Sequence, residues 1–307
     1  MPRKEILDRI ERYIQPFRVT RGEGFQLKNY DSGQSCGLNK ADASRLVEQS
    51  TAWLAEEQQM LYAQDRWSLL LVFQAMDAAG KDSTIRHVMS GINPQGCQVF
   101  SFRQPSQEEL SHDFLWRYTC RLPERGKIGI FNRSYYEETL VVRVHELYKT
   151  EKLPPQWQKP DIFERRYRQI NDFEKYLYEN GVTVLKFFLH LSKEEQKKRL
   201  LARIDKEEKN WKFSAADLAE RQYFDEYQSA YEDTINATST KHAPWHVIPA
   251  DKKWYARLCI SHFLADALEK IDPRYPELTG DQKAQLQSCR DRLTAEGGDA
   301  PEPAKEE

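Results

Sequence analysis

Residues 70–83 of the chain read Leu-Leu-Val-Phe-Gln-Ala-Met-Asp-Ala-Ala-Gly-Lys-Asp-Ser, and this stretch decides the fold. An apolar run of strand-forming residues ends in small residues, and a helix-like pattern follows Gly80 and Lys81. Strand, tight loop and helix N-terminus form the layout of a phosphate-binding loop, because free backbone N–H groups and the helix dipole attract anions there. Lys81 adds a point charge for phosphoryl oxygens.

Two positions depart from the common phosphate-loop pattern. The usual first glycine is Ala75, and the usual serine or threonine after the lysine is Asp82. The alternative is an ordinary strand-to-helix turn, in which Gly80 only permits tight packing. The stretch alone leaves both interpretations open.

Composition narrows the class of protein. The 307 residues are 39% hydrophobic and 31% charged, with a net charge of −2. So small a net charge gives no general attraction to polyanions, so we expect no nucleic-acid partner and only a local anion site. The apolar runs are too short to span a bilayer, and residues 1–5 lack a signal-peptide core. We therefore expect a cytoplasmic protein with no membrane partner. The five cysteines show no metal or disulfide spacing.

Strand and helix patterns alternate along most of the chain. The predicted strands are Ser68–Gln74, Gln98–Phe102, Lys127–Phe131, Val182–Leu189 and Trp245–Pro249. The predicted helices are 41–66, 82–90, 106–121, 134–148, 161–180, 192–208, 214–236 and 252–270. This alternation predicts an α/β domain over 51–290, a parallel sheet with helices on both faces. Residues 1–50 form an N-terminal arm and helix start, and 291–307 an acidic, disordered tail.

A second strand also ends in polar side chains. Asn132 and Arg133 follow the apolar strand Lys127–Phe131. In phosphate-loop enzymes the equivalent strand often ends in a carboxylate that helps to hold Mg²⁺. Asn132 offers a neutral amide oxygen instead, and Arg133 could grip a phosphate with two hydrogen bonds. The alternative is a strand that ends in an Asn turn, with Arg133 on a solvated face.

The chain resembles the family-2 polyphosphate kinases, which are polyphosphate:nucleotide phosphotransferases. Asp77–Lys81 and Asn132–Glu137 are similar to the two signature motifs of that family. The resemblance runs from about Trp53 to Leu268 and includes Ser90–Gly96, Leu122–Gly126 and Ala243–Trp245. It implies a P-loop kinase fold similar to thymidylate kinase, with a five-stranded parallel sheet and a helical lid at about 192–235. Asn132 and Glu137 resemble the third class, which phosphorylates both nucleoside mono- and diphosphates.

The resemblance also implies roles for particular residues. Asp77, Lys81, Arg133 and Glu137 are expected to be catalytic, with Mg²⁺ held by Asp77 and Asn132. Glu137 has an alternative role as an acid that complements the dipole at a helix start. The expected substrates are inorganic polyphosphate and AMP, ADP and ATP or their guanine equivalents, in a homodimer or homotetramer.

Polyphosphate needs a track of basic groups, as nucleic-acid backbones do. The expected phosphate contacts are Ala78, Ala79, Gly80, Lys81, Asp82, Ser83, Arg86, Arg117, Arg121, Arg133, Arg143, Arg199 and Arg203. The last two belong to the basic lid segment 197–212, which could instead be a solvated helix face. Two other functions stay open: a nucleotide kinase with ATP as donor, and a nucleotide- or polyphosphate-binding protein without catalysis.

Overall fold

A six-stranded sheet forms the centre of the computed structural model, which describes residues 10–296 except for the side chains of 49–51. The strand order is β1-β6-β5-β2-β4-β3. The strands are β1 (Arg18–Val19), β2 (Ser68–Ala75), β3 (Cys97–Ser101), β4 (Ile128–Asn132), β5 (Val182–His190) and β6 (Trp245–Pro249). The five predicted strands are confirmed as parallel neighbours. The sheet gains a sixth, antiparallel edge strand, β1, which is too short to show a sequence pattern.

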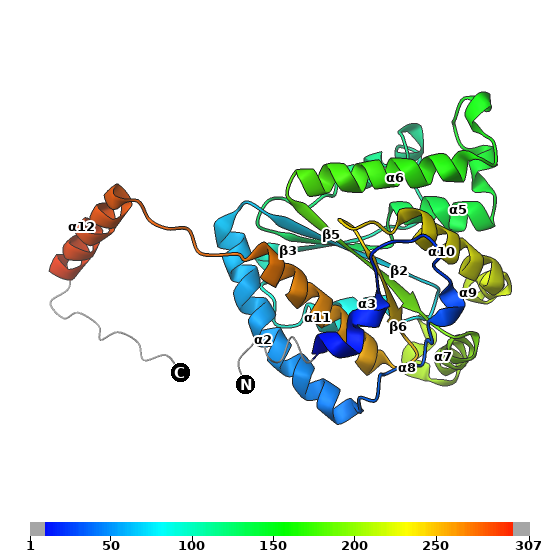
Figure 1. Cartoon of the computed structure of the whole chain (residues 1–307), viewed down its shortest axis with the longest axis horizontal. Helices are drawn as coiled ribbons and strands as arrows, with labels where there is room; N and C mark the ends of the chain where they lie inside the picture. Colours follow the sequence, from blue (N-terminus) through cyan, green and yellow to red (C-terminus); the bar gives the residue numbers. More distant parts are fainter. Residues whose placement is uncertain (1–9, 297–307) are drawn as a thin grey trace.

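Helices cover both faces of the sheet (Figure 1). One face carries α2 (Lys40–Gln64), α3 (Lys81–Val88) and α11 (Lys253–Ile271). The other carries α4 (Trp116–Thr119), α5 (Val141–Val144), α6 (Ile162–Glu179) and α10 (Phe224–Thr238). A hydrophobic core lies on each face of the sheet, and strand β2 contributes to both. Leu69 and Leu71 pack in the core of the first face, and Leu70 and Val72 in that of the second. A strand buried on both faces reads as a continuous apolar run, which is why it was predictable.

The expected lid consists of several short helices. These are α7 (Lys193–Asp205), α8 (Glu207–Asn210), α9 (Ala215–Glu220) and the 3-10 helix η8 (Arg221–Tyr223), after which α10 begins. Ser192 caps α7 by accepting a hydrogen bond from the Glu195 amide. The remaining 3-10 helices are η1 (Gln15–Phe17), η2 (Leu27–Asn29), η3 (Pro94–Gly96), η4 (Glu109–Ser111), η5 (Tyr135–Thr139), η6 (Leu147–Thr150) and η7 (Pro155–Trp157).

Four predicted helices are wrong as continuous elements: the lid segments 192–208 and 214–236, which divide into the helices just named, and two segments before the lid. The segment 106–121 contains only η4 and α4, and the segment 134–148 is divided into η5, α5 and the start of η6. Short polar side chains take backbone groups at the breaks, since the Asp113 carboxylate accepts from the Leu115 amide and the Thr139 hydroxyl donates to the Tyr136 carbonyl. Such local bonds compete with helical hydrogen bonds.

Helix α12 (Gly280–Glu296) lies apart from the rest of the molecule (Figure 1). The expectation of a tail without regular structure from residue 291 is therefore wrong for 291–296, which continue this helix. Residues 297–307 lie outside the described residues, as does the start of the N-terminal arm, residues 1–9. Within the described part of the arm, Ile10 and Ile14 are fully buried in the first core. No helix among residues 10–296 is long and apolar enough to cross a bilayer.

Candidate active site

The two signature segments meet where β2 and β4 end side by side. The two strands are parallel, and Phe73 is in register with Asn132. The carboxyl ends of parallel strands lie at one edge of the sheet, where ligands bind in such folds. The loop after β2 and the turn at Arg133 are therefore adjacent, and the Arg133 amide donates to the Phe73 carbonyl at 3.1 Å.

The loop after β2 has the backbone of a phosphate cradle. Gly80 is the N-cap of α3 with φ of +96°, and Ala78 also has a positive φ, +64°. A left-handed alanine is strained, and such conformations persist only where the surroundings hold them. The strand–loop–helix geometry predicted from the sequence is present, and the Lys81 side chain folds back to 3.4 Å from the Ala75 carbonyl.

Lys81 lies among charges of both signs. Burial is the main cause that lowers the pKa of its ammonium, and the nearby Arg133 lowers it further. The carboxylates of Asp77, Glu137 and Asp82 oppose this effect. A phosphate bound at the loop would add negative charge beside this ammonium and favour its charged form.

Arg133 connects the two segments through its guanidinium. One terminal nitrogen lies 3.3 Å from Asp77 Oδ1, and the other lies 3.6 Å from Glu137 Oε2. The Glu137 carboxylate is the main cause that raises the pKa of Arg133, so the guanidinium stays charged. The backbone of Arg133 is left-handed, with φ of +66°. Four residues predicted to be catalytic therefore lie together around one point.

Asn132 stands where related folds have a carboxylate, and Asp82 stands where they have a serine or threonine. The Asn132 amide nitrogen donates to Asp82 Oδ1 at 2.7 Å and to the Ser101 hydroxyl at 3.3 Å. The carboxylate that is absent at the end of β4 is thus supplied from the first turn of α3. The unusual Asp82 after the lysine and the unusual Asn132 at the end of β4 are therefore partners in one contact.

A magnesium ion would find few protein ligands here. No group of three or more His, Cys, Asp or Glu side chains within residues 10–296 is arranged to hold a metal. Mg²⁺ usually takes one or two carboxylates, waters and substrate phosphates. Asp77 and Asp82 fit that donor set, and Asn132 can add an amide oxygen.

A cavity of about 1430 Å³ adjoins the site. Its walls come from segments 102–118, 133–157 and 162–172, together with Glu220. Arg133 and Glu137 line it, so the cavity reaches the phosphate loop through the Arg133 guanidinium. Aromatic side chains such as Phe114 and Trp157 line other parts of the wall. The cavity combines a charged side with apolar surface, as nucleotide pockets do.

Comparison with known proteins agrees with this geometry. Residues 37–276 match the family described as polyphosphate kinase 2 (PPK2). The chain belongs to the PPK2 family. An ADP-polyphosphate phosphotransferase of Rhodopseudomonas palustris is 51% identical over 280 residues, which cover 90% of this chain and 97% of the relative. An AMP/ADP-polyphosphate phosphotransferase of Meiothermus ruber is 45% identical over 266 residues, 86% of this chain and 96% of the relative.

The crystal structure of polyphosphate kinase 2 from Arthrobacter aurescens TC1 superposes with a TM-score of 0.82 at 43% identity. The match covers 90% of this chain and 96% of that one. The fold is therefore the P-loop kinase fold of this family, as the resemblance implied.

One arginine predicted to bind phosphate has another role. All five N–H groups of Arg199 are used within the protein, so the expected contact of Arg199 with phosphate stays a prediction. Its terminal nitrogens donate to the carbonyls of Ala78, Ala79, Ala250 and Asp251, at 2.7–3.2 Å, and its Nε to Glu195. The side chain is 9% exposed. In this PPK2 chain Arg199 clamps the phosphate loop to the end of β6.

The other predicted arginines differ in how free they are. Arg203 binds Asp217 and the Lys212 carbonyl, Arg143 binds Asp233 and the Tyr167 hydroxyl, and the buried Arg117 binds Glu109 and the Arg103 carbonyl. Arg86 and Arg121 are exposed on the surface. The paired arginines of this PPK2 site are thus held by protein groups, and a contact to phosphate stays a prediction for them.

Two cations of α11 that the sequence did not indicate, Lys253 and Arg257, lie near the loop, and Lys209 of the basic lid segment lies near Lys253. A Cβ placed on Gly80 would lie 3.8 Å from Lys253 Cε. Arg257 lies one turn further along α11, and its positive charge, after burial, lowers the pKa of His87 on α3. Burial, followed by Arg199, Lys209 and Arg257, lowers the pKa of Lys253. Lys209, Lys253 and Arg257 form no side-chain hydrogen bond or ion pair with another residue in the range 10–296.

Proposed function

We propose that this chain transfers the terminal phosphoryl group of inorganic polyphosphate to nucleoside mono- and diphosphates, AMP to ADP and ADP to ATP, reversibly. The observation that carries the proposal is a phosphate loop with Lys81 that has the cavity-lining Arg133 near it and the unpaired Lys253 beside Gly80. The named relatives, which act on ADP or on AMP and ADP, support the choice of substrates. Adenine and guanine nucleotides share the phosphate chemistry that this arrangement would recognise.

The acceptor enters through the cavity, with its phosphates toward Arg133. A terminal phosphate oxygen of the acceptor attacks the end phosphorus of polyphosphate. A new P–O bond forms, the bond to the bridging oxygen breaks, and the remaining chain leaves with that oxygen one phosphate shorter. Lys81 and Arg133 balance the charge on the transferring group. Phosphoanhydride bonds are present on both sides, so the equilibrium lies near balance.

Magnesium would be held by Asp77 and Asp82, with Asn132 beside them, and would neutralise phosphate charge when bound. The chain's own groups do the rest of the work. The phosphate loop binds and orients the phosphates of the substrates. The lid helices exclude water that would intercept the phosphoryl group. No covalent enzyme intermediate is required.

The direct test is ATP formation from ADP, polyphosphate and Mg²⁺, with no other phosphoryl donor. We expect turnover with polyphosphate, and AMP in place of ADP should also be phosphorylated. Phosphorylation only with ATP as donor would favour the nucleotide-kinase alternative. Binding of both ligands to folded protein without turnover would favour the non-catalytic alternative.

The donor side yields a prediction from Lys253 and Arg257. In the double variant Lys253→Ala/Arg257→Ala we expect KM for polyphosphate to rise about 10-fold, because two unpaired cations beside the loop are lost. The KM for ADP should change little, since the acceptor cavity has no wall from α11. The fall of kcat/KM with salt should also become shallower.

The matched control is Lys175→Ala/Arg274→Ala, which removes two exposed cations elsewhere on the chain. Its KM for polyphosphate should stay at the wild-type value. An unchanged KM in the α11 variant would place the donor on another face of the loop.

The acceptor side yields a prediction from Glu137, whose carboxylate lies in the cavity wall beside Arg133. A monophosphate acceptor is one phosphate shorter than a diphosphate, so it leaves a gap between its phosphate and the loop. Water or a metal ion must fill this gap, and a carboxylate orders that water or ion more strongly than an amide does. We expect Glu137→Asn to lower kcat/KM for AMP about 10-fold more than for ADP, on the scale of one charged hydrogen bond.

The measurement is the ratio of kcat/KM for AMP and ADP in both proteins. The control Glu179→Asn changes an exposed acid on α6 and should keep the ratio. If the ratio were also constant in Glu137→Asn, Glu137 would be only an acid in the first turn of η5.

A further inference from the structure

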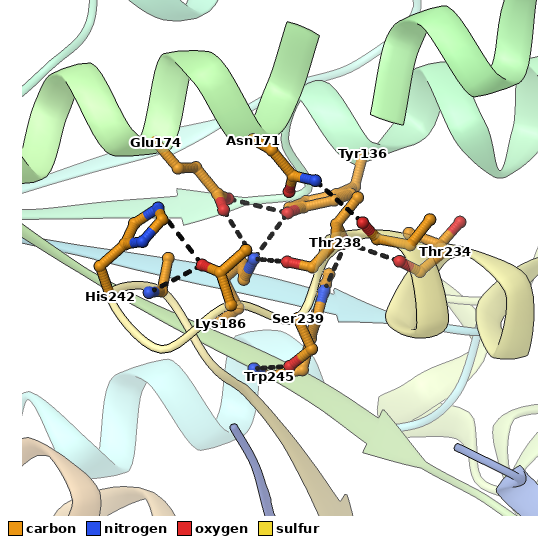
Figure 2. A network of polar contacts seen from close by, with 12 residues as sticks. Tyr136, Asn171, Glu174, Lys186, Thr234, Thr238, Ser239, His242 and Trp245 are labelled. Atoms are coloured by element: carbon orange, nitrogen blue, oxygen red, sulfur yellow. Dashed lines mark hydrogen bonds and ion pairs between the residues drawn. The ribbon is translucent and has the colours of Figure 1, made fainter. Parts of the chain in front are cut away.

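A lysine and a glutamate form a buried ion pair behind the second signature segment. Lys186 lies in the middle of β5 and Glu174 in α6, and both side chains are 0% exposed. Their charged atoms are 2.6 Å apart. Figure 2 shows the pair at the centre of a polar network in the otherwise apolar core between α6 and the sheet.

The hydrogen-bonding capacity of the pair is used. The Lys186 ammonium donates to Glu174 Oε2 at 2.6 Å, to the Thr238 carbonyl at 2.7 Å and to the Tyr136 hydroxyl at 2.9 Å. The other oxygen of Glu174 accepts from the hydroxyls of Tyr135 and Tyr136, at 2.9 and 2.8 Å. A fully satisfied buried network holds its members in one arrangement.

Both tyrosines belong to the segment that carries the active site. They follow Arg133 and Ser134 directly, and Glu137 comes next. Ser134 holds the near end of this turn, since its hydroxyl accepts from the Gln74 side chain and from the Tyr136 amide. The Glu174 carboxylate holds the far ends of both rings. The turn is thus fixed at the backbone and at two side-chain tips.

The network also joins this turn to α10, which follows the lid helices. Lys186 is the shared donor, because it binds Tyr136 of the turn and the carbonyl of Thr238 at the end of α10. A second contact links Thr234 of α10 to Thr139 of η5, with hydroxyl oxygens 3.1 Å apart. The end of α10 and the turn therefore form one unit.

Stability alone does not account for this pair. An apolar pair of similar volume is often as stable as a buried ion pair, because removing two charges from water is unfavourable. Specific position is what such a pair can add. Arg133 has a left-handed backbone that needs support from its surroundings.

We propose that Glu174 is a positioning residue for phosphoryl transfer: its carboxylate, whose buried charge Lys186 balances, anchors Tyr135 and Tyr136 and so holds Arg133 and Glu137 at the phosphate loop. The proposal rests on the proposed function where it is tested by activity. A second test, the amide hydrogen exchange of residues 133–137, does not depend on activity. Neither Glu174 nor Lys186 touches substrate.

Two double variants that differ in one group test the proposal. Glu174→Gln/Lys186→Met removes both charges but keeps an amide oxygen to accept from the tyrosines. Glu174→Leu/Lys186→Met removes the charges and the acceptor together. We expect a lower Tm in the second variant, whose two buried tyrosine hydroxyls lose their acceptor. At a temperature well below both Tm values, kcat should stay within about 3-fold of wild type in the first variant and fall about 30-fold in the second, with KM for polyphosphate little changed.

Amide hydrogen exchange of residues 133–137 is the readout that does not depend on turnover. It should be faster in the leucine variant than in the glutamine variant. If wild type shows no turnover, the proposed function fails, and the exchange rates still decide on the anchor.

Tyr135→Phe/Tyr136→Phe covers the case in which the leucine variant does not fold. It removes the two hydroxyls and leaves the ion pair in place, and the same loss of kcat and faster exchange are expected. Equal kcat and equal exchange in the glutamine and leucine variants would overturn the proposal. So would wild-type kcat and exchange in the phenylalanine variant.

Discussion

Replacing Lys81 with methionine should lower kcat/KM for polyphosphate-dependent ATP formation by about 10³-fold, the scale for losing a preorganised group that stabilises transition-state charge. The fold should survive, because the loop conformation comes from Gly80, Ala78 and the Arg199 clamp and not from the lysine side chain. Steady-state rates with ADP and a melting curve of the same preparation are the two measurements.

The melting curve should show equal or higher stability for the variant without ligands. Burial lowers the pKa of Lys81 in the folded protein, so its charged form is disfavoured there relative to the unfolded chain. This penalty is fully present below the folded pKa and disappears above the ordinary lysine pKa. The gain in Tm of Lys81→Met should therefore be largest near neutral pH and shrink as the pH rises.

Lys175→Met is the control, since Lys175 is an exposed residue of α6. It should keep both the rate and the Tm of wild type. A rate near the wild-type value in Lys81→Met would mean that the phosphate-binding loop has been placed on the wrong turn.

Most of the strands could be predicted because a buried strand is made largely of apolar residues. Four of the five parallel strands are mostly apolar and largely buried, β3 is partly exposed, and the predicted bounds of all five agree within one residue. The segments 106–121 and 134–148 failed because Asp113 and Thr139 bind nearby backbone groups, which helical periodicity does not reveal. Helix α12 carries no apolar face that a pattern could show.

The centre of the site could be predicted for a similar reason. Asp77, Lys81, Arg133 and Glu137 follow the ends of two adjacent parallel strands, so strand order alone brings them together. The partners of other side chains depend on packing between distant segments. Lys186 had a visible signal, a lone charge within an apolar strand, but its partner Glu174 is set by how α6 packs on the sheet. The cytoplasmic location and the dimer or tetramer stay predictions.

Arg199 shows most clearly what sequence reasoning could not supply. Basic residues on a lid helix suggest contacts with phosphate, and the sequence cannot show that two carbonyl groups of the loop and two at the end of β6 lie within reach of the same guanidinium. The contact forms only in the folded protein, because Arg199 and Ala78 are 121 residues apart in the sequence.

Arg199→Met should therefore reduce both stability and activity. The change leaves four carbonyls without their donor, and the unfolding free energy should fall by about 3 kcal/mol, the scale of losing a buried charged hydrogen-bonding partner. Because the carbonyls of Ala78 and Ala79 would be released, the neighbouring loop N–H groups lose their orientation, and kcat should fall at least about 10²-fold. Arg199→Lys should restore neither the stability nor the activity fully, since an ammonium cannot replace the planar guanidinium with its five N–H donors.

The comparison with Arg203→Met separates a clamp from an arginine that acts on the transferring phosphoryl group. Arg203 binds only within the lid, through Asp217 and the Lys212 carbonyl, so its loss should change Tm little. A clamp predicts that Tm and kcat fall together in Arg199→Met. If kcat fell there while Tm and urea midpoint stayed at wild-type values, Arg199 would leave its carbonyls in the working enzyme and act on phosphate directly. Thermal and urea unfolding, measured beside ATP formation for both variants, decide between the two roles.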